Sequence, residues 1–222
     1  MVAPVAIDLG AGPRAQAYAF YRAAKQPRWG FTTRLDVGPL LRAVRFWQED
    51  CPDLSPMLAY HHALLHATRA VPALRQRLTS EGGAVQWPSL DASITLARSD
   101  DSFGIAYLPW SERLRDFVAP ARAAIGAARQ PGTDWGMGHA HRGCLYTTTV
   151  PWMDFSHFEH AHTAAFDEGT PRVAFGRFCP VDDERTEMAF NLEIHHALVD
   201  GVHAGRPVQA LEALLAEPGQ LW

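Results

Sequence analysis

The chain has 222 residues, of which 47% are hydrophobic and 20% are charged, and its formal net charge is -4 at pH 7. This length and balance are typical of one globular domain with a sizeable core, and the excess of acidic residues argues against a nucleic-acid partner. No apolar stretch approaches the roughly 18 residues that a membrane-spanning helix needs, and residues 1–4 lack the basic start of a signal peptide. We therefore expect a cytoplasmic protein with no membrane partner.

The first part of the chain predicts alternating helices and strands. Residues 13–22 predict a helix, with proline tolerated in its first turn, and Arg14 lies four residues before Tyr18 on one face, with Tyr21 nearby. Further predicted elements are a strand over residues 30–37, a helix over residues 37–46 and a helix over residues 55–78 with a break near Pro72.

The helix predicted over residues 55–78 contains His61, His62 and His66, and the last two are four residues apart. This spacing allows two imidazoles to bind one zinc ion. However, no glutamate follows His62 and no third ligand is evident. We therefore expect packed or partly exposed histidines and no metal.

The middle of the chain predicts strands and a glycine-rich loop. The predicted elements are a hairpin over residues 82–88, strands over residues 92–97 and 102–108, and a helix over residues 111–128. The glycine-rich residues 130–143 predict a loop, and its Trp135 is a candidate wall for an aromatic substrate.

The last part of the chain predicts two strands, over residues 173–178 and 187–194, joined by a polar turn, and then a helix over residues 203–216. Helices therefore alternate with strands and hairpins along the whole chain. This order predicts a single α/β domain over residues 1–222, built as a two-layer sandwich in which helices pack on a mixed β-sheet. The three cysteines are too widely spaced to indicate a disulfide framework or a CxxC metal site.

The segment HHALVDG, residues 195–201, follows an alternating strand pattern over residues 190–194. Histidine titrates near neutrality, so an imidazole at the end of a strand can take a proton from an alcohol or a thiol without a metal. Asp200 and Gly201 then predict a turn held by a carboxylate. Without further context, a polar strand end followed by an ordinary turn would explain the same residues.

A second segment gives that context. In YTTTVPWMDFSHF, residues 146–158, a hydroxyl-bearing residue stands three positions before a Pro-Trp pair, and an F-x-x-F pattern follows. Together with the HHxxxDG motif, this segment resembles the chloramphenicol acetyltransferase family, and the resemblance extends from about Arg14 to Leu215. The motif also occurs in dihydrolipoamide acyltransferase cores and peptide-synthetase condensation domains. We expect neither, because the chain has no lipoyl domain and about half the length of a condensation domain.

The resemblance implies direct transfer of an acetyl group from acetyl-CoA to a hydroxyl of chloramphenicol or a similar small acceptor, without an acyl-enzyme. It implies that His196, the second histidine of the pair, is the general base and that Thr148 stabilises the oxyanion. It further implies that an Arg14–Asp200 ion pair supports the site. The candidate aromatic residues of the substrate pocket are then Tyr21, Phe103 and Phe158, together with Trp135 of the predicted loop. The family is homotrimeric with sites at subunit interfaces, so the base and the pocket aromatics are expected from neighbouring chains.

Several departures leave the acceptor open. Thr148 stands where the family typically has serine, and Ala174 stands where the family often has a threonine that acts through water. We expect Ala174 to lower turnover. Lys25 and Arg28 bring charge to the expected pocket. The alternatives are an acyltransferase of this fold with another acceptor, a non-catalytic relative that binds CoA or another ligand, and a metal-dependent hydrolase.

Overall fold

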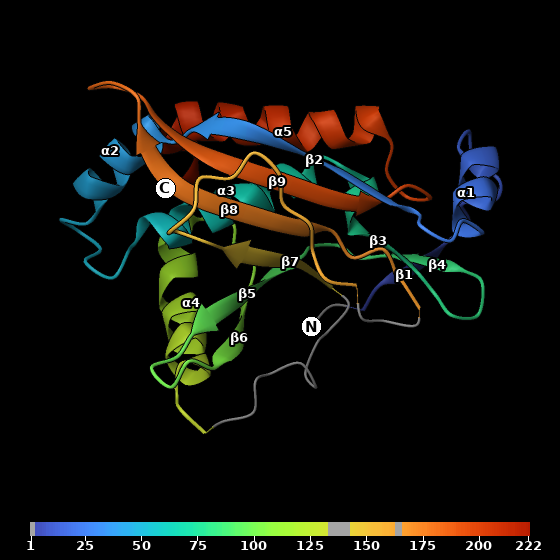
Figure 1. The fold of residues 1–222 in the computed structure, drawn as a ribbon, viewed down its shortest axis with the longest axis horizontal. Helices are drawn as coiled ribbons and strands as arrows, with labels where there is room; N and C mark the ends of the chain where they lie inside the picture. The colour runs from blue at the N-terminus through green and yellow to red at the C-terminus, as the bar shows by residue number, and fades with distance from the viewer. Residues whose placement is uncertain (1–2, 133–142, 163–165) are drawn as a thin grey trace.

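The structure is a computed structural model that describes residues 3–132, 143–162 and 166–222 (Figure 1). Its larger sheet has six strands, in the spatial order β2 (Arg28–Asp36), β9 (Thr186–His195), β8 (Arg172–Pro180), β7 (Cys144–Thr149), β5 (Asp91–Ala97) and β6 (Phe103–Leu108). The β5–β7 and β7–β8 pairs are parallel and the other neighbours are antiparallel. A smaller sheet contains β1 (Val5–Ile7), β4 (Ala84–Gln86) and β3 (Gln76–Leu78).

Most of the helices form the second layer, and the first one lies beyond the end of the larger sheet in Figure 1. The helices are α1 (Ala15–Arg22), α2 (Gly38–Trp47), α3 (Pro56–Arg69), α4 (Leu114–Ala128) and α5 (Gly201–Ala216), with short 3-10 helices η1 (Pro72–Arg75) and η3 (Pro218–Leu221). In Figure 1, α3 and α5 lie behind the larger sheet. The predicted α/β architecture, with helices packed on a mixed sheet, is therefore confirmed. No helix within the described ranges is both long and apolar enough to span a bilayer.

The two faces of the larger sheet differ in character. Phe175 packs on Tyr60 of α3 on the helix-covered face, with 4.5 Å between the ring centroids, and Phe190 packs against Phe175. Because side chains alternate along a strand, Asn191, Glu193 and His195 of β9 point to the opposite face, which we call the open face. These three polar residues are nevertheless almost fully buried.

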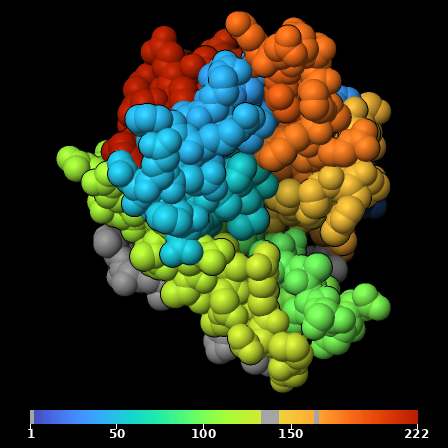
Figure 2. Space-filling model, turned by 90° about the vertical axis from the view of Figure 1, so that its left-hand side faces the viewer, coloured from blue at the N-terminus to red at the C-terminus, as the bar shows by residue number. Residues whose placement is uncertain are grey.

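A loop that follows β7 covers Asn191 and Glu193, whereas His195 lies next to Gly169. Residues 150–162 pass in front of β8 and β9 in Figure 1, and Figure 2 shows the start of this loop against the end of the sheet that carries the β8–β9 turn. The backbone N–H of Arg177 donates to the Met153 carbonyl at 2.8 Å, and Arg34 pairs with Asp154. A Cβ at Gly176 would lie 3.1 Å from that carbonyl, so glycine permits the close approach.

The structure corrects one predicted helix. The helix expected over residues 55–78 ends at Arg69, and its last residues form η1 and β3 instead. Pro72 has no N–H to donate and its ring clashes with the preceding turn, so the α-helix cannot continue through it. The chain after η1 then pairs with β4, which places the hairpin turn at residues 79–83, with Gly82 at a φ of +99°.

Candidate active site

The HHxxxDG motif lies where β9 ends and α5 begins. The backbone N–H of His196 donates to the Pro27 carbonyl at 2.8 Å, which ties the end of β9 to the start of β2. The chain then turns, and Asp200 caps α5 by accepting from the His203 backbone N–H at 3.4 Å and contacting its Nδ1 at 2.7 Å. A carboxylate at a helix N-terminus satisfies otherwise unpaired N–H groups.

Arg14, just before α1, joins this turn to the first helix. Its Nε lies 2.9 Å from Asp200 Oδ2, and its two Nη groups donate to the carbonyl oxygens of residues 196–198 at 2.7 to 3.1 Å. The ion pair that the resemblance implied is therefore present in the structure. Partial burial raises the pKa of Asp200, but hydrogen bonds from Arg14 and His203 outweigh it, and the net pKa lies below the ordinary value. The carboxylate stays ionised and holds the turn.

The two histidines have different surroundings. The half-buried His196 ring stacks on Tyr21, with 3.8 Å between ring centroids and 4° between planes, and Trp29 lies 5.4 Å away. Its Nδ1 is buried and has no hydrogen-bond partner among the described residues. Its Nε2 is not among these buried atoms. When Nδ1 carries the proton, a lone pair is available at Nε2.

His195 cannot offer that lone pair. It is 2% exposed, and its Nδ1 accepts the Ala197 backbone N–H at 3.2 Å. Burial lowers its pKa to about 4, so the ring is neutral and its proton lies on Nε2. Of these two rings, His196 is therefore the one with an accessible nitrogen lone pair, whereas the sequence prediction chose it from the family resemblance alone.

Thr148 lies elsewhere on the open face. It is half-buried on β7, 3.5 Å from Thr95 Oγ1, and its register partners are Ala174 on β8 and then Asn191 on β9. His196 comes five residues after Asn191, so it lies roughly 16 Å further along the strands and roughly 10 Å across them. Within one chain, these two predicted catalytic residues do not meet.

The predicted pocket aromatics are also dispersed. Tyr21 contacts His196 directly, but Phe103 lies on β6, the far edge strand, with 44% of its surface exposed. Phe158 lies in the loop after β7, with its ring 5.2 Å from Phe155, and lines a cavity of about 200 Å³ next to Asn191. Trp135 is outside the described residues.

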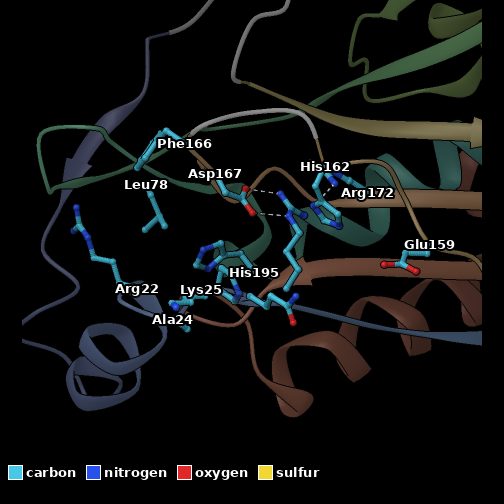
Figure 3. A pocket seen from close by; sticks show the side chains of 13 residues that line it. Arg22, Ala24, Lys25, Leu78, Glu159, His162, Phe166, Asp167, Arg172 and His195 are labelled. Carbon is cyan, nitrogen blue, oxygen red and sulfur yellow. Dashed lines mark hydrogen bonds and ion pairs between the residues drawn. The ribbon is translucent and has the colours of Figure 1, made fainter.

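The sequence did not predict a larger cavity beside the motif. It has a volume of about 570 Å³, and Figure 3 shows its side chains converging from α1, the start of β2, the segment before β8 and the end of β9. The polar residues that line it include Arg22, Lys25, Arg28, Asp167, Arg172 and His195.

Ion pairs form the inner wall of this cavity. Arg28 donates two 2.6 Å hydrogen bonds to Asp167, drawn as dashed lines in Figure 3, and lies 3.4 Å from Glu193. Arg172 lies 3.3 Å from the same Glu193 oxygen. The alternation along residues 190–194 could have suggested an inward Glu193, but its partners depend on strand register, which the sequence pattern does not contain.

The histidines of α3 use their ring nitrogens within the fold. His61 Nδ1 lies 2.8 Å from the Met57 carbonyl and its Nε2 lies 2.9 Å from Thr147 Oγ1. His62 and His66 contact the carbonyls of Ser111 and Glu112 at 3.1 and 2.8 Å. These rings link α3 to the sheet and to the start of α4. Over the described ranges, no three His, Cys, Asp or Glu side chains are grouped so that they could hold a metal ion.

Residues 4–212 match the protein family described as chloramphenicol acetyltransferase. A chloramphenicol acetyltransferase of Streptomyces acrimycini is 27% identical over 220 residues, which cover 98% of this chain and 97% of that protein. Chloramphenicol acetyltransferase 2 of Escherichia coli is 23% identical over 209 residues, which cover 94% of this chain and 95% of that protein.

Two solved structures are similar in fold. A chloramphenicol acetyltransferase superposes with a TM-score of 0.83 at 20% identity, covering 96% of this chain and 100% of that one. A dihydrolipoamide acetyltransferase of Azotobacter vinelandii superposes with a TM-score of 0.72 at 15% identity, covering 100% of this chain and 94% of that one.

Proposed function

Because the chain belongs to the chloramphenicol acetyltransferase family, we propose that it transfers the acetyl group of acetyl-CoA directly to a hydroxyl of chloramphenicol or a similar small acceptor. The observation that carries the proposal is the state of His196: its ring stacks on Tyr21, its backbone is held by Arg14 and its Nε2 is not enclosed.

In the proposed reaction, His196 Nε2 removes the acceptor's hydroxyl proton as the oxygen attacks the thioester carbonyl carbon. A tetrahedral intermediate forms, and the Thr148 hydroxyl donates a hydrogen bond to its oxyanion. The intermediate then collapses, the carbon–sulfur bond breaks, and the CoA sulfur takes the proton from the imidazolium. General-base catalysis typically contributes about 10²- to 10⁴-fold and one oxyanion donor about 10²- to 10³-fold.

The protein holds the base in place through two contacts. Stacking on Tyr21 restricts rotation of the His196 ring, and Arg14 fixes the carbonyl of the same residue at 3.1 Å. A base fixed in this way reacts without first losing conformational freedom, which is the advantage that orientation gives to a catalyst.

We also propose that each site forms between two subunits of a homotrimer. The register separates His196 from Thr148 within one chain, so a site that uses both must take them from different copies. Apolar side chains are exposed at the open face and on the loop that covers part of it: Phe103 at 44%, Trp152 at 70% and Met153 at 52%. Such side chains favour burial against a partner.

The test is release of the CoA thiol from acetyl-CoA with chloramphenicol and with a panel of other alcohols and amines. We expect the wild type to release thiol and His196→Ala to lose at least about 100-fold in kcat/KM. His66→Ala, on the helix layer away from β9, is the matched control and keeps its activity.

Equal activity in wild type and His196→Ala would overturn the assignment of the base. A wild type that binds acetyl-CoA but releases no thiol with any acceptor would instead favour the non-catalytic alternative.

A further inference from the structure

We propose that the acceptor carries a carboxylate, and that this group binds at the end of the large cavity formed by Arg22, Lys25 and His195. The inference rests on the proposed acetyl transfer and specifies the acceptor class for that site. It is derived from the charges on the cavity wall, which fall into two groups, one paired and one not.

The paired group is the inner wall. Asp167 binds Arg28 through two hydrogen bonds, and Glu193 lies within 3.4 Å of both Arg28 and Arg172. The side chains of Arg28 and Glu193 are only 7% and 9% exposed. Two carboxylates therefore neutralise two guanidinium groups, and this network has no net charge to offer a ligand.

The unpaired group lies at the end of the cavity next to α1. Among the described residues, Lys25 makes no hydrogen bond or ion pair, and Arg22 donates only to the Tyr18 hydroxyl and the Gly82 carbonyl, which are neutral. The remaining carboxylate of the cavity wall is Glu159, and Figure 3 shows it at the opposite end from Arg22. The end of the cavity next to α1 therefore has two positively charged side chains, Arg22 and Lys25, and neither is paired with a carboxylate in the part of the chain that the structure describes.

His195 adds a donor between these charges and the inner wall. Its Nδ1 accepts the Ala197 N–H at 3.2 Å, so the neutral ring carries its proton on Nε2 and lines the cavity with a donor. Lys25 and the N–H donor of His195 therefore suit an anionic group, and Arg22, at the left of Figure 3, adds positive charge to this end of the cavity.

The position of this site favours the acceptor over the phosphates of CoA as the source of the anion. Arg22 directly follows Tyr21, which stacks on His196, and Pro27 of the cavity wall accepts the His196 N–H. The pantetheine arm separates the phosphates of CoA from its thioester, so a site on the residues next to Tyr21 suits the acceptor better than it suits those phosphates. A volume of about 570 Å³ suits a small acceptor.

A neutral acceptor would be disfavoured at this end of the cavity. It would displace part of the water around the exposed Lys25 and the half-buried Arg22 without supplying a negative partner, and desolvating an unpaired charge costs free energy. The cavity should therefore prefer a carboxylate over its uncharged ester.

The kinetic test uses matched pairs of acceptors that share one hydroxyl: para-(hydroxymethyl)benzoate, mandelate and N-acetylserine, each compared with its methyl ester. We expect at least one carboxylate to have a kcat/KM about tenfold or more above that of its ester, the size expected for one charge-assisted contact. Lys25→Met should abolish this preference through the acceptor KM, Lys25→Arg should retain it, and Arg45→Met, an exposed charge loss on α2, should leave it unchanged.

The coenzyme provides a second arm of the same assay. If the anion came from CoA, Lys25→Met would raise the KM of acetyl-CoA, and acetyl-dephospho-CoA would not show that increase. That result overturns the inference, as does equal use of carboxylate and ester in all three pairs by the wild type.

A binding measurement separates this inference from the proposed reaction. Lys25 is the only lysine in the chain, so reductive methylation followed by mass spectrometry of its peptide reports on this site alone. We expect a preferred carboxylate, but not its ester, to slow methylation of Lys25. Protection without acetyl transfer to any acceptor would overturn the proposed function and keep the anion site, whereas transfer without protection or preference would overturn the anion site and keep the function.

Discussion

At the residue scale, His195 and His196 are neighbours in sequence but have different hydrogen-bonding partners. His195 uses Nδ1 to accept a backbone N–H inside the fold, and His196 leaves Nε2 accessible while its ring stacks on Tyr21. The first ring therefore contributes to stability, and the second is suited to proton transfer. Their substitutions should separate these two contributions.

We expect His195→Ala to lower the free energy of unfolding by about 1 to 3 kcal/mol, because it leaves the buried Ala197 N–H without an acceptor. His196→Ala loses mainly one ring contact and should cost no more than about 1 kcal/mol. Urea unfolding of both variants measures the difference. The hydrogen-bonding assignment is wrong if His196→Ala is the more destabilised of the two.

At the element scale, Arg14 connects the start of α1 to the turn between β9 and α5. Its guanidinium contacts one carboxylate and three carbonyls, which a single ammonium group cannot reproduce. We expect Arg14→Lys to lower kcat by about tenfold and stability by about 1 to 2 kcal/mol. Arg69→Lys, at the exposed pair with Glu112, is the matched control. It should change neither kcat in the thiol-release assay nor the free energy of unfolding.

A wild-type kcat in Arg14→Lys would show that the turn does not need the forked side chain. A loss of stability with normal kcat would assign Arg14 to the fold alone.

The link between α3 and β7 gives a pH dependence. Burial lowers the pKa of His61 to about 4, below the value of about 6.5 of an unfolded chain. The folded state therefore binds a proton at His61 less readily than the unfolded state does. The contribution of the neutral ring to stability is complete above pH 6.5, falls as the pH drops towards 4 and is constant below that. From pH 7 to pH 5, the loss from one such group is about 2 kcal/mol.

We therefore expect His61→Gln to be less stable than the wild type at pH 7 and to approach it at pH 5, since the variant no longer titrates at this position. Guanidinium unfolding at both pH values tests this. If the free energy of unfolding fell by the same amount in both proteins between pH 7 and pH 5, the assignment of a neutral buried His61 would be wrong. Because His61 holds Thr147, the neighbour of Thr148, the same variant should also reduce acetyl transfer.

The elements themselves were largely predictable from sequence. Periodicity indicated most helices and strands, since apolar spacing reflects which face of an element is buried. It failed at residues 70–78, where Pro72 ended α3 and the remaining residues found strand partners far along the chain. The Arg28–Asp167–Glu193 network also depends on pairings between distant segments, which local pattern does not specify.

At the scale of the whole molecule, strand register is the main new information. The resemblance identified His196 and Thr148 as partners in one reaction, and the sheet places Thr148 in line with Asn191, five residues before His196. One polypeptide therefore carries both halves of the proposed site at two separate places. Each interface of a ring of copies would bring a His196 to a Thr148 of the next copy.

This arrangement predicts complementation between inactive variants. His196→Ala and Thr148→Ala should each lose activity as homotrimers, but mixed trimers should contain interfaces that combine the intact His196 of one chain with the intact Thr148 of the other. Random mixing of equal amounts restores about one quarter of all sites, and each mixed trimer that tandem purification selects has about one intact site in three. Co-expression with two affinity tags, tandem purification and the thiol-release assay measure the recovery, and light scattering should give three times the 24.5 kDa chain mass. If both residues acted within one chain, every site would keep a defect and mixing would restore nothing, so activity at the level of the parent variants in verified mixed trimers would disprove the shared site.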